Sequence, residues 1–137
     1  MKSFFAIIFL LLIAFVSTSS FKSTGNEDLS VLMDRMTKET KQIKKQIDSG
    51  KTQWKGLKKY GVDYQIILTA IPSDASKKGE HFDDFALSFL KETERLRNAD
   101  ESGLNTQYNA VITACINCHS SYCPGPISML KRMKVKE

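Results

Sequence analysis

The apolar residues of this chain recur at helical spacing, and this periodicity restricts the fold more than any other feature of the sequence. Over residues 27–49, one stripe of the expected helix is apolar and most of the lysines lie away from it. Asn26 is the expected N-cap, two acids follow it in the first turn, and Gly50 is expected to end the helix. The stripe consists of Leu29, Leu32, Met33, Met36, Thr40, Ile43 and Ile47.

The next region is less regular. Residues 52–60 are expected to form a short helix, and Gly61 interrupts it. Residues 62–71 are apolar and suit either a strand or a buried helix. We expect a helix, because an isolated strand would find no partner strand elsewhere in this chain. A polar link then covers residues 72–79.

Two further helices are expected, one over residues 80–99 and one that starts near Leu104. A tight polar turn at residues 98–103 separates them, and Pro124 stops the second. Four amphipathic segments joined by short links predict an all-α fold, specifically an antiparallel four-helix bundle. The expected inward residues of the two helices are Phe82, Phe85, Ala86, Phe89, Leu90, Thr93 and Leu96, and then Tyr108, Val111, Ile112, Cys115, His119 and Tyr122.

Residues 1–20 have the pattern of a secretory signal peptide. A basic start at Lys2 precedes an uninterrupted apolar run, residues 4–16, and the small residues 17–20 follow it. The run is shorter than the roughly 20 residues that a membrane span needs. We expect export to the periplasm and a protein that is soluble once the signal is cleaved. An uncleaved N-terminal anchor is the competing interpretation.

The run Cys115-Ile116-Asn117-Cys118-His119 has the spacing that attaches a c-type haem covalently. The two thiols form thioethers with the two vinyl groups of the porphyrin, and the adjacent histidine is then the proximal ligand of the iron. In a helix, these three side chains share one face. The motif therefore predicts one haem c on the C-terminal helix, attached through Cys115 and Cys118, with His119 as the iron ligand.

Other uses of these cysteines weigh less. An exported protein could form a Cys115–Cys118 disulfide, but that bridge closes a very small loop and leaves His119 unexplained. A zinc site is weaker still, because the chain has only three cysteines and two histidines, and His81 is distant in sequence. A thioredoxin-like redox pair needs a strand-to-helix context, and the sequence around Cys115 and Cys118 does not predict one. The remaining thiol, Cys123, is free, packed or available for an intermolecular disulfide.

Charge excludes one class of partner. The formal net charge is +5, mild and evenly spread, and this does not indicate a nucleic-acid-binding protein. An acidic redox partner or an anionic surface is compatible with it. Apart from the haem motif, the sequence contains no nucleophile–base pair or metal-ligand cluster, so we do not expect an enzyme.

The order of these parts resembles cytochrome c-prime, the class II c-type cytochromes. The resemblance covers residues 28–122 and is most specific in the turn at 98–103, in residues 108–111 and in residues 115–122. An aromatic residue three positions after the haem histidine is usual in that family, and Tyr122 occupies this position. The chain departs from the family at Cys123, where a basic residue is usual. We therefore expect a haem domain over residues 21–123 and a basic tail over residues 124–137.

The resemblance also implies what lies on the other side of the iron. Some members of the family leave the iron five-coordinate and bind small gases such as NO or CO. Others add a methionine of the first helix as a sixth ligand and carry electrons. Met33 and Met36 are the candidates for that ligand here, with core filling as the alternative for both and a distal His81 as a weaker one. Tyr108 and Tyr122 are expected to pack beside the haem.

Three hypotheses follow from these observations. The first is an exported electron-transfer haem protein with a redox partner protein. The second is a five-coordinate haem protein that binds small gases. The third is a haem-free exported helical interaction domain held by a disulfide. The resemblance further implies a possible homodimer through the first two helices.

Overall fold

Helices account for most of residues 27–136, the part of the chain that a computed structural model describes. Within this range the only β-type pairing is an isolated bridge between Asp28 and Ile71, so the all-α prediction is confirmed. The expected signal peptide, residues 1–20, lies outside the described residues. No helix in the described part of the chain is both long enough and apolar enough to span a membrane.

The first long helix, α2 (Leu29–Asp48), follows the predicted stripe but starts later than expected. Its N-cap is Asp28, whose side chain accepts a hydrogen bond from the backbone N–H of Ser30 at 2.7 Å. The prediction of Asn26 as the cap was therefore wrong. The physical reason is that Ile71 pairs with the backbone on either side of Asp28, which keeps residues 27–28 extended. Gly50 ends the helix as predicted, with a φ of +63°.

The region after α2 is the part that periodicity described least well. It forms a short helix, α3 (Trp54–Leu57), and a 3₁₀ segment, η1 (Tyr64–Leu68), instead of the expected continuous helix over residues 62–71. Gly61 between them has a φ of +68°, and a Cβ there would lie 3.2 Å from that of Thr93. The chain therefore turns tightly against the neighbouring helix at this point. A second 3₁₀ turn, η2 (Ala75–Lys77), lies in the polar link.

The next two helices form close to where the sequence predicts them. They are α4 (Phe82–Arg97) and α5 (Leu104–Tyr122), and they pack directly against each other. In the turn between them, the Asp100 carboxylate accepts a hydrogen bond from the backbone N–H of Gly103 at 2.8 Å. The inward face of α4 buries Phe82, Ala86, Phe89, Thr93 and Leu96, whereas Phe85 and Leu90 are only partly buried.

The segment that follows α5 packs on the rest of the molecule. It contains a short helix, α6 (Ile127–Met133), which lies against α5 and buries Leu130 and Met133. Beyond α6, the Asn109 side chain donates to the Val135 carbonyl at 3.0 Å and accepts from the Val135 backbone N–H at 2.9 Å. Residues 127–135 are therefore part of the packed domain, although the sequence suggested a separate tail.

The two hydrogen bonds between the Asn109 side chain and the Val135 backbone make a testable contribution to stability. Replacing Asn109 with alanine leaves the buried N–H and C=O of Val135 without partners, so we expect a loss of about 2 kcal/mol in the free energy of unfolding. Urea unfolding followed by circular dichroism measures it. Asn105 is the matched control, because its exposed amide bonds only the Lys136 carbonyl. We expect its alanine variant to cost about 0.5 kcal/mol or less, and equal costs for the two variants would contradict the prediction.

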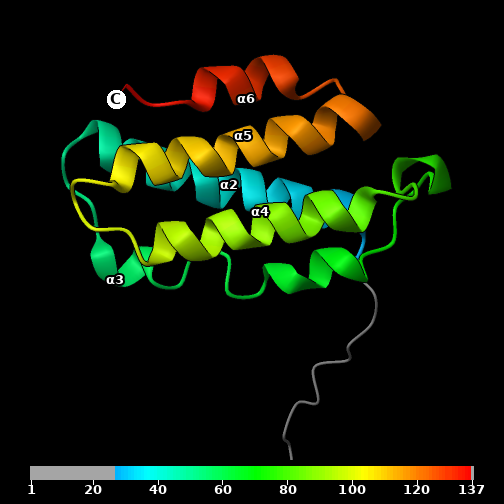
Figure 1. Cartoon of the computed structure of the whole chain (residues 1–137), viewed down its shortest axis with the longest axis horizontal. Helices are drawn as coiled ribbons and strands as arrows, with labels where there is room; N and C mark the ends of the chain where they lie inside the picture. The colour runs from blue at the N-terminus through cyan, green and yellow to red at the C-terminus, as the bar shows by residue number, and fades with distance from the viewer. Residues whose placement is uncertain (1–26, 137) are drawn as a thin grey trace, which may run out of the picture.

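The arrangement of the helices decides where a site can form. In Figure 1, α2 and α4 run in one direction, α5 runs back beside α4, and α6 covers the outer side of α5. The start of α2, the start of α4 and the end of α5 consequently lie at the same end of the molecule. The core between the helices includes three buried tyrosines, Tyr60, Tyr64 and Tyr108, and burial raises the pKa of each.

Candidate cofactor site

A cavity of about 390 Å³ lies at the end of the molecule where α2 and α4 begin and α5 ends. Its size falls within the range of about 300–1,000 Å³ that is usual for small-molecule and cofactor sites. It brings the second cysteine and the histidine of the motif together with residues from the start of α2 and from the link around η2. Its walls are formed by Leu29, Ser30, Met33, Asp34, Pro72, Ser73, Asp74, Lys77, Phe82, Cys118, His119, Tyr122, Cys123 and Pro126.

His119 is oriented by the way α5 ends. Pro124 disfavours a helical conformation for the residue before it, and Cys123 has left the helical region, with φ −154° and ψ 75°. The Cys123 carbonyl then accepts a hydrogen bond from Nδ1–H of His119 at 2.9 Å. This bond selects the tautomer that leaves Nε2 with a free lone pair. A ring nitrogen bonded to a backbone carbonyl, with the other nitrogen available, is the usual state of a metal-binding histidine.

The two motif cysteines differ in their surroundings. Cys118 lines the cavity, whereas Cys115 lies one turn earlier and packs partly buried against the core. Burial raises the pKa of Cys118 to about 11. Burial and the nearby Cys118 thiol raise the pKa of Cys115 to about 12. Both thiols are therefore protonated at neutral pH and retain the S–H bond that thioether formation consumes.

The structure separates the two candidate methionines. Met33 lines the same cavity as His119, from the α2 side. Met36 lies one turn further along α2, is 7% exposed and belongs to the core. Only Met33 is therefore placed on the cavity. The stripe pattern could not make this distinction, because both positions fall on the inward face of the helix.

The two candidate tyrosines are also separated. Tyr122 lines the cavity, and its ring packs edge-on against Phe82 with ring centroids 5.7 Å apart. Tyr108 is completely buried in the core, and its hydroxyl donates to the backbone carbonyl of Thr40 at 3.4 Å. His81 lies at the start of α4 with its side chain 70% exposed, and it is not among the cavity residues.

The donor set can be compared with what a c-type haem requires. The motif offers two protonated thiols one turn apart, and the cavity offers an imidazole with a free Nε2 and the Met33 thioether of α2. Leu29 of α2 and Phe82 of α4 give it apolar walls of the kind that a porphyrin ring requires, and Ser30, Asp34, Ser73 and Asp74 make another part of the lining polar. The residues present therefore fit haem c. Lys77, which lies 3.8 Å from Asp74, is a cation within the lining that suits a propionate.

Several cavity residues were not predicted from the sequence. Ser73, Asp74 and Lys77 belong to the polar link, which showed no periodicity and suggested only a loop. The Cys123 carbonyl was missed for a different reason, because backbone groups leave no mark in a residue pattern. A signal was present nonetheless, since Pro124 predicts that the residue before it leaves the helix.

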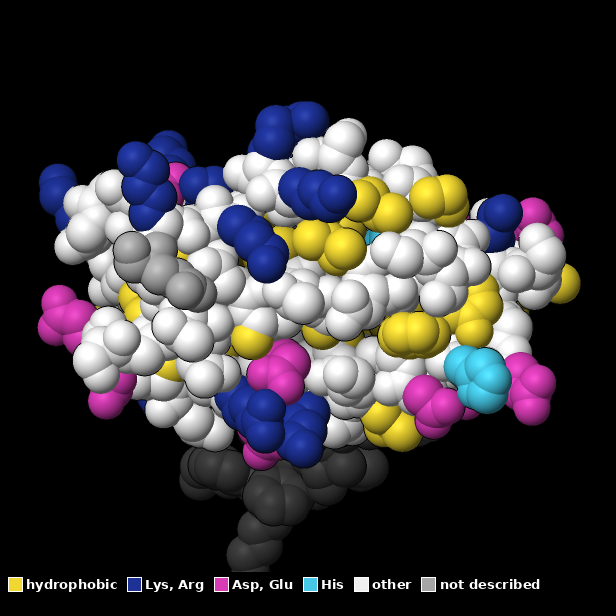
Figure 2. All heavy atoms as spheres, turned by 45° about the horizontal axis from the view of Figure 1, so that its top comes forward, with side chains coloured by type: hydrophobic (Ala, Val, Ile, Leu, Met, Phe, Trp, Pro, Cys, Tyr) yellow, Lys and Arg dark blue, Asp and Glu magenta, His cyan; other side chains and the backbone are white. Residues whose placement is uncertain are grey.

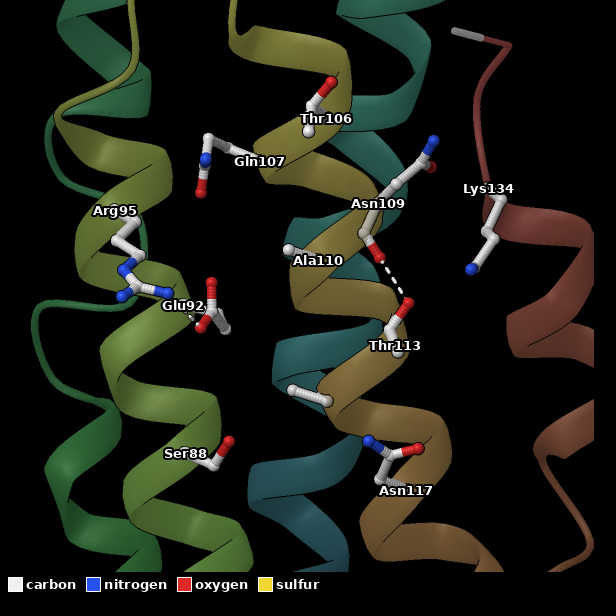
Figure 3. Close-up of a pocket in the computed structure, with 11 residues that line it drawn as sticks. Ser88, Glu92, Arg95, Thr106, Gln107, Asn109, Ala110, Thr113, Asn117 and Lys134 are labelled. Carbon is white, nitrogen blue, oxygen red and sulfur yellow. Dashed lines mark hydrogen bonds and ion pairs between the residues drawn. The ribbon is translucent and has the colours of Figure 1, made fainter.

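A second, larger cavity is polar and contains none of the motif residues. It measures about 550 Å³ and lies between α4, α5 and Lys134. Figure 3 shows its hydroxyl and amide side chains, with the Glu92–Arg95 ion pair on the α4 side and Gln107 extending from α5 towards it. The Gln107 Oε1 atom is buried without a hydrogen-bond partner in the described structure. The chemistry of this cavity differs from that of the motif site.

No family model, curated protein or solved structure gives a significant match to this chain. Among the described residues, no group of three or more His, Cys, Asp or Glu side chains is arranged to hold a metal ion. The residues of the motif and the cavity therefore carry the functional proposal by themselves.

Proposed function

We propose that this chain is an exported, periplasmic c-type haem protein that transfers electrons. In this proposal the haem is held by thioethers from Cys115 and Cys118, with His119 as the proximal ligand of its iron. The protein would be a variant of the cytochrome c-prime type, an antiparallel four-helix bundle. Residues 54–71 would take the place of a regular second helix, and α6 would be an addition to the bundle.

The hydrogen bond from His119 to the Cys123 carbonyl carries this proposal furthest. It supports iron ligation because it fixes the imidazole ring and leaves Nε2 as the only ligating atom. The disulfide alternative accounts for neither the bond nor the cavity.

The residues of the chain have distinct tasks in this proposal. The Cys115 and Cys118 thiols would each hold the haem by addition to a vinyl group, in which the S–H bond would break, an S–C bond would form and the hydrogen would go to the other vinyl carbon. Leu29, Phe82 and Tyr122 line the cavity and would limit the access of water to the haem. When bound, a haem supplies a one-electron couple between ferric and ferrous iron. We propose a carrier and not an enzyme, with a redox protein as its partner.

The position of Met33 favours electron transfer over gas binding. Met33 lines the same cavity as His119, and a methionine sulfur bound to the iron would supply a sixth ligand and raise the reduction potential. A closed six-coordinate site also changes little on reduction, as a carrier requires. A five-coordinate iron that binds NO or CO is the second candidate, and it applies if Met33 serves only as lining.

Spectra of the protein produced in a host that attaches haem c test this proposal. We expect a Soret band, a pyridine haemochrome typical of two thioethers, and a low-spin spectrum that CO does not alter quickly. Colour that is fully extracted by acid–acetone, or no colour at all, would contradict covalent haem. A high-spin spectrum that shifts under CO would select gas binding instead.

A further inference from the structure

Three of the four tyrosines of this chain are buried in its core, and none of them takes part in the proposed haem attachment. Tyr60, Tyr64 and Tyr108 are 4%, 1% and 0% exposed. On the face drawn in Figure 2, hydrophobic side chains reach the surface only in separate areas among charged and other side chains. Because the three phenols are buried, they do not contact solutes, and any chemistry that they perform depends on their neighbours in the core.

The three phenols form a continuous chain across the core. Burial raises the pKa of Tyr60 and of Tyr108, and the nearby Cys115 thiol adds to both shifts, so one end of the chain lies close to a cysteine that is proposed to hold the haem. The Tyr108 hydroxyl donates to the Thr40 carbonyl at 3.4 Å, and the Thr40 hydroxyl lies 2.8 Å from that of Tyr60. The ring of Tyr60 then packs edge-on against that of Tyr64, with ring centroids 5.4 Å apart. Such a succession of phenols allows an electron to cross the core in short steps.

The far end of this chain differs from the rest in its hydrogen-bond partner. The Tyr64 hydroxyl donates to a carboxylate oxygen of Glu39 at 2.6 Å. The Tyr60 hydroxyl donates to the hydroxyl of Thr40, because that hydroxyl already gives its own proton to the backbone carbonyl four residues earlier, at 2.7 Å. The partner of Tyr108 is a backbone carbonyl. A carboxylate accepts a proton as a base, whereas a neutral hydroxyl or a carbonyl does not.

This difference decides which phenol can be oxidised. A phenol that loses one electron becomes a strong acid, so a neutral radical forms only where the proton leaves with the electron. Tyr64 has an existing hydrogen bond for this transfer, with the Glu39 carboxylate as the base. The Arg35 guanidinium lies 5.8 Å from the centre of the Tyr64 ring and disfavours positive charge on that ring. A radical formed in this chain therefore resides on Tyr64 in its neutral form.

We propose that Tyr64 is a redox-active tyrosine, which gives an electron through the other two buried tyrosines to a haem site oxidised by a peroxide, and gives its proton to Glu39. Hydrogen peroxide takes up two electrons and two protons and becomes two waters, so each peroxide oxidises the Tyr64 phenols of two molecules. In each phenol the O–H bond breaks, and the proton passes to Glu39 and then to solvent. An external one-electron donor and a proton restore the phenol. The inference rests on the proposed haem function for the site of oxidation, but the Tyr64–Glu39 pair does not depend on it.

Electron paramagnetic resonance of the purified protein, frozen after addition of hydrogen peroxide, tests the proposal. We expect a tyrosyl radical in the unchanged protein and none in Tyr64→Phe, which keeps the ring that packs on Phe89 and removes only the hydroxyl. Glu39→Gln keeps a hydrogen-bond acceptor but no base, so we expect radical formation to slow about a hundredfold. The matched control is Glu94→Gln, which removes the same charge from an exposed side chain of α4 and should leave the rate unchanged. A radical kept in Tyr64→Phe, or equal rates in the two glutamine variants, would overturn the proposal.

A second measurement needs no haem. Light on tris(bipyridine)ruthenium(II) with persulfate produces a ruthenium(III) complex that takes one electron from the aromatic side chains of the same full chain. We expect the radical to settle on Tyr64, again absent from Tyr64→Phe and slowed in Glu39→Gln. Tyr60→Phe should slow radical formation by peroxide and not by light, because it interrupts only the route from the haem. A radical that stays on Trp54 or Tyr122 of the unchanged protein would overturn the proposal.

The two measurements separate this inference from the proposed function. A purified chain that contains no haem but forms the Tyr64 radical under light would refute the proposed function and leave the Tyr64–Glu39 pair standing. A haem protein that forms this radical under light and not with peroxide would overturn the electron route from the haem and leave the proposed function standing.

Discussion

Replacing Cys115 and Cys118 together with alanine is expected to abolish covalent haem attachment. No thiol then remains at the motif to form a thioether, so any residual haem is held only by His119 and by packing. We expect acid–acetone to extract all the colour from this variant, whereas the unchanged protein keeps its colour. Helical circular dichroism checks that the variant folds. The single variant Cys115→Ala should keep its haem through one thioether, with a shifted haemochrome band.

The third cysteine is the control for this experiment. Cys123 lines the same cavity but lies outside the motif, and the proposal uses only its backbone carbonyl. Alanine retains that carbonyl, so Cys123→Ala should carry covalent haem in the same amount as the unchanged protein. Colour that stays with the double variant after acid–acetone treatment would contradict haem attachment through Cys115 and Cys118. Colour that is lost from Cys123→Ala alone would contradict it as well.

Replacing Met33 with leucine is expected to change the iron from low-spin to high-spin. Leucine has nearly the same volume and removes only the sulfur, so the cavity wall stays in place while the sixth ligand is lost. The visible spectrum of the ferric protein should then shift, the ferrous protein should bind CO rapidly, and the reduction potential should fall. Spectra and a potentiometric titration measure all three.

Met36→Leu is the matched control, one turn further along the same helix. Met36 packs in the core and does not line the cavity, so leucine there should leave the spectrum and the CO reaction unchanged. A small loss of stability, below about 1.5 kcal/mol, is the expected effect of this swap. If Met36→Leu alone removes the low-spin spectrum, the structural placement of the distal ligand is wrong. If neither variant removes it, the sixth ligand is a residue other than Met33 and Met36.

The regular helices were predictable because their information is local. The apolar stripe of α2, the start of α5 at Leu104 and the end of α5 before Pro124 all follow from spacing, capping and the missing N–H of proline. The motif was equally readable, since its chemistry depends on residues that are neighbours in sequence. Local patterns also predicted the break at Gly61, although its left-handed backbone and its close approach to Thr93 were not foreseen.

The errors occurred where distant segments compete for the backbone. Asn26 is a reasonable cap by residue type, but the pairing of Ile71 with residues 27–29 moved the start of α2 to Leu29. Residues 62–71 had no local signal for a 3₁₀ segment. The tail after Pro126 had helical spacing, yet its packing on α5 depends on the side chain of Asn109, 26 residues before Val135.

The sequence by itself determined the helical class of the described chain, the bounds of its longest helices to within about two residues, and the three motif residues that define the candidate chemistry. Only the tertiary structure decided that Met33 and not Met36 lines the cavity with His119, and that Tyr108 is core while Tyr122 lines the site. The reason is that helical periodicity specifies which face of a segment is inward, whereas the height at which one helix meets another depends on contacts between residues far apart in the chain.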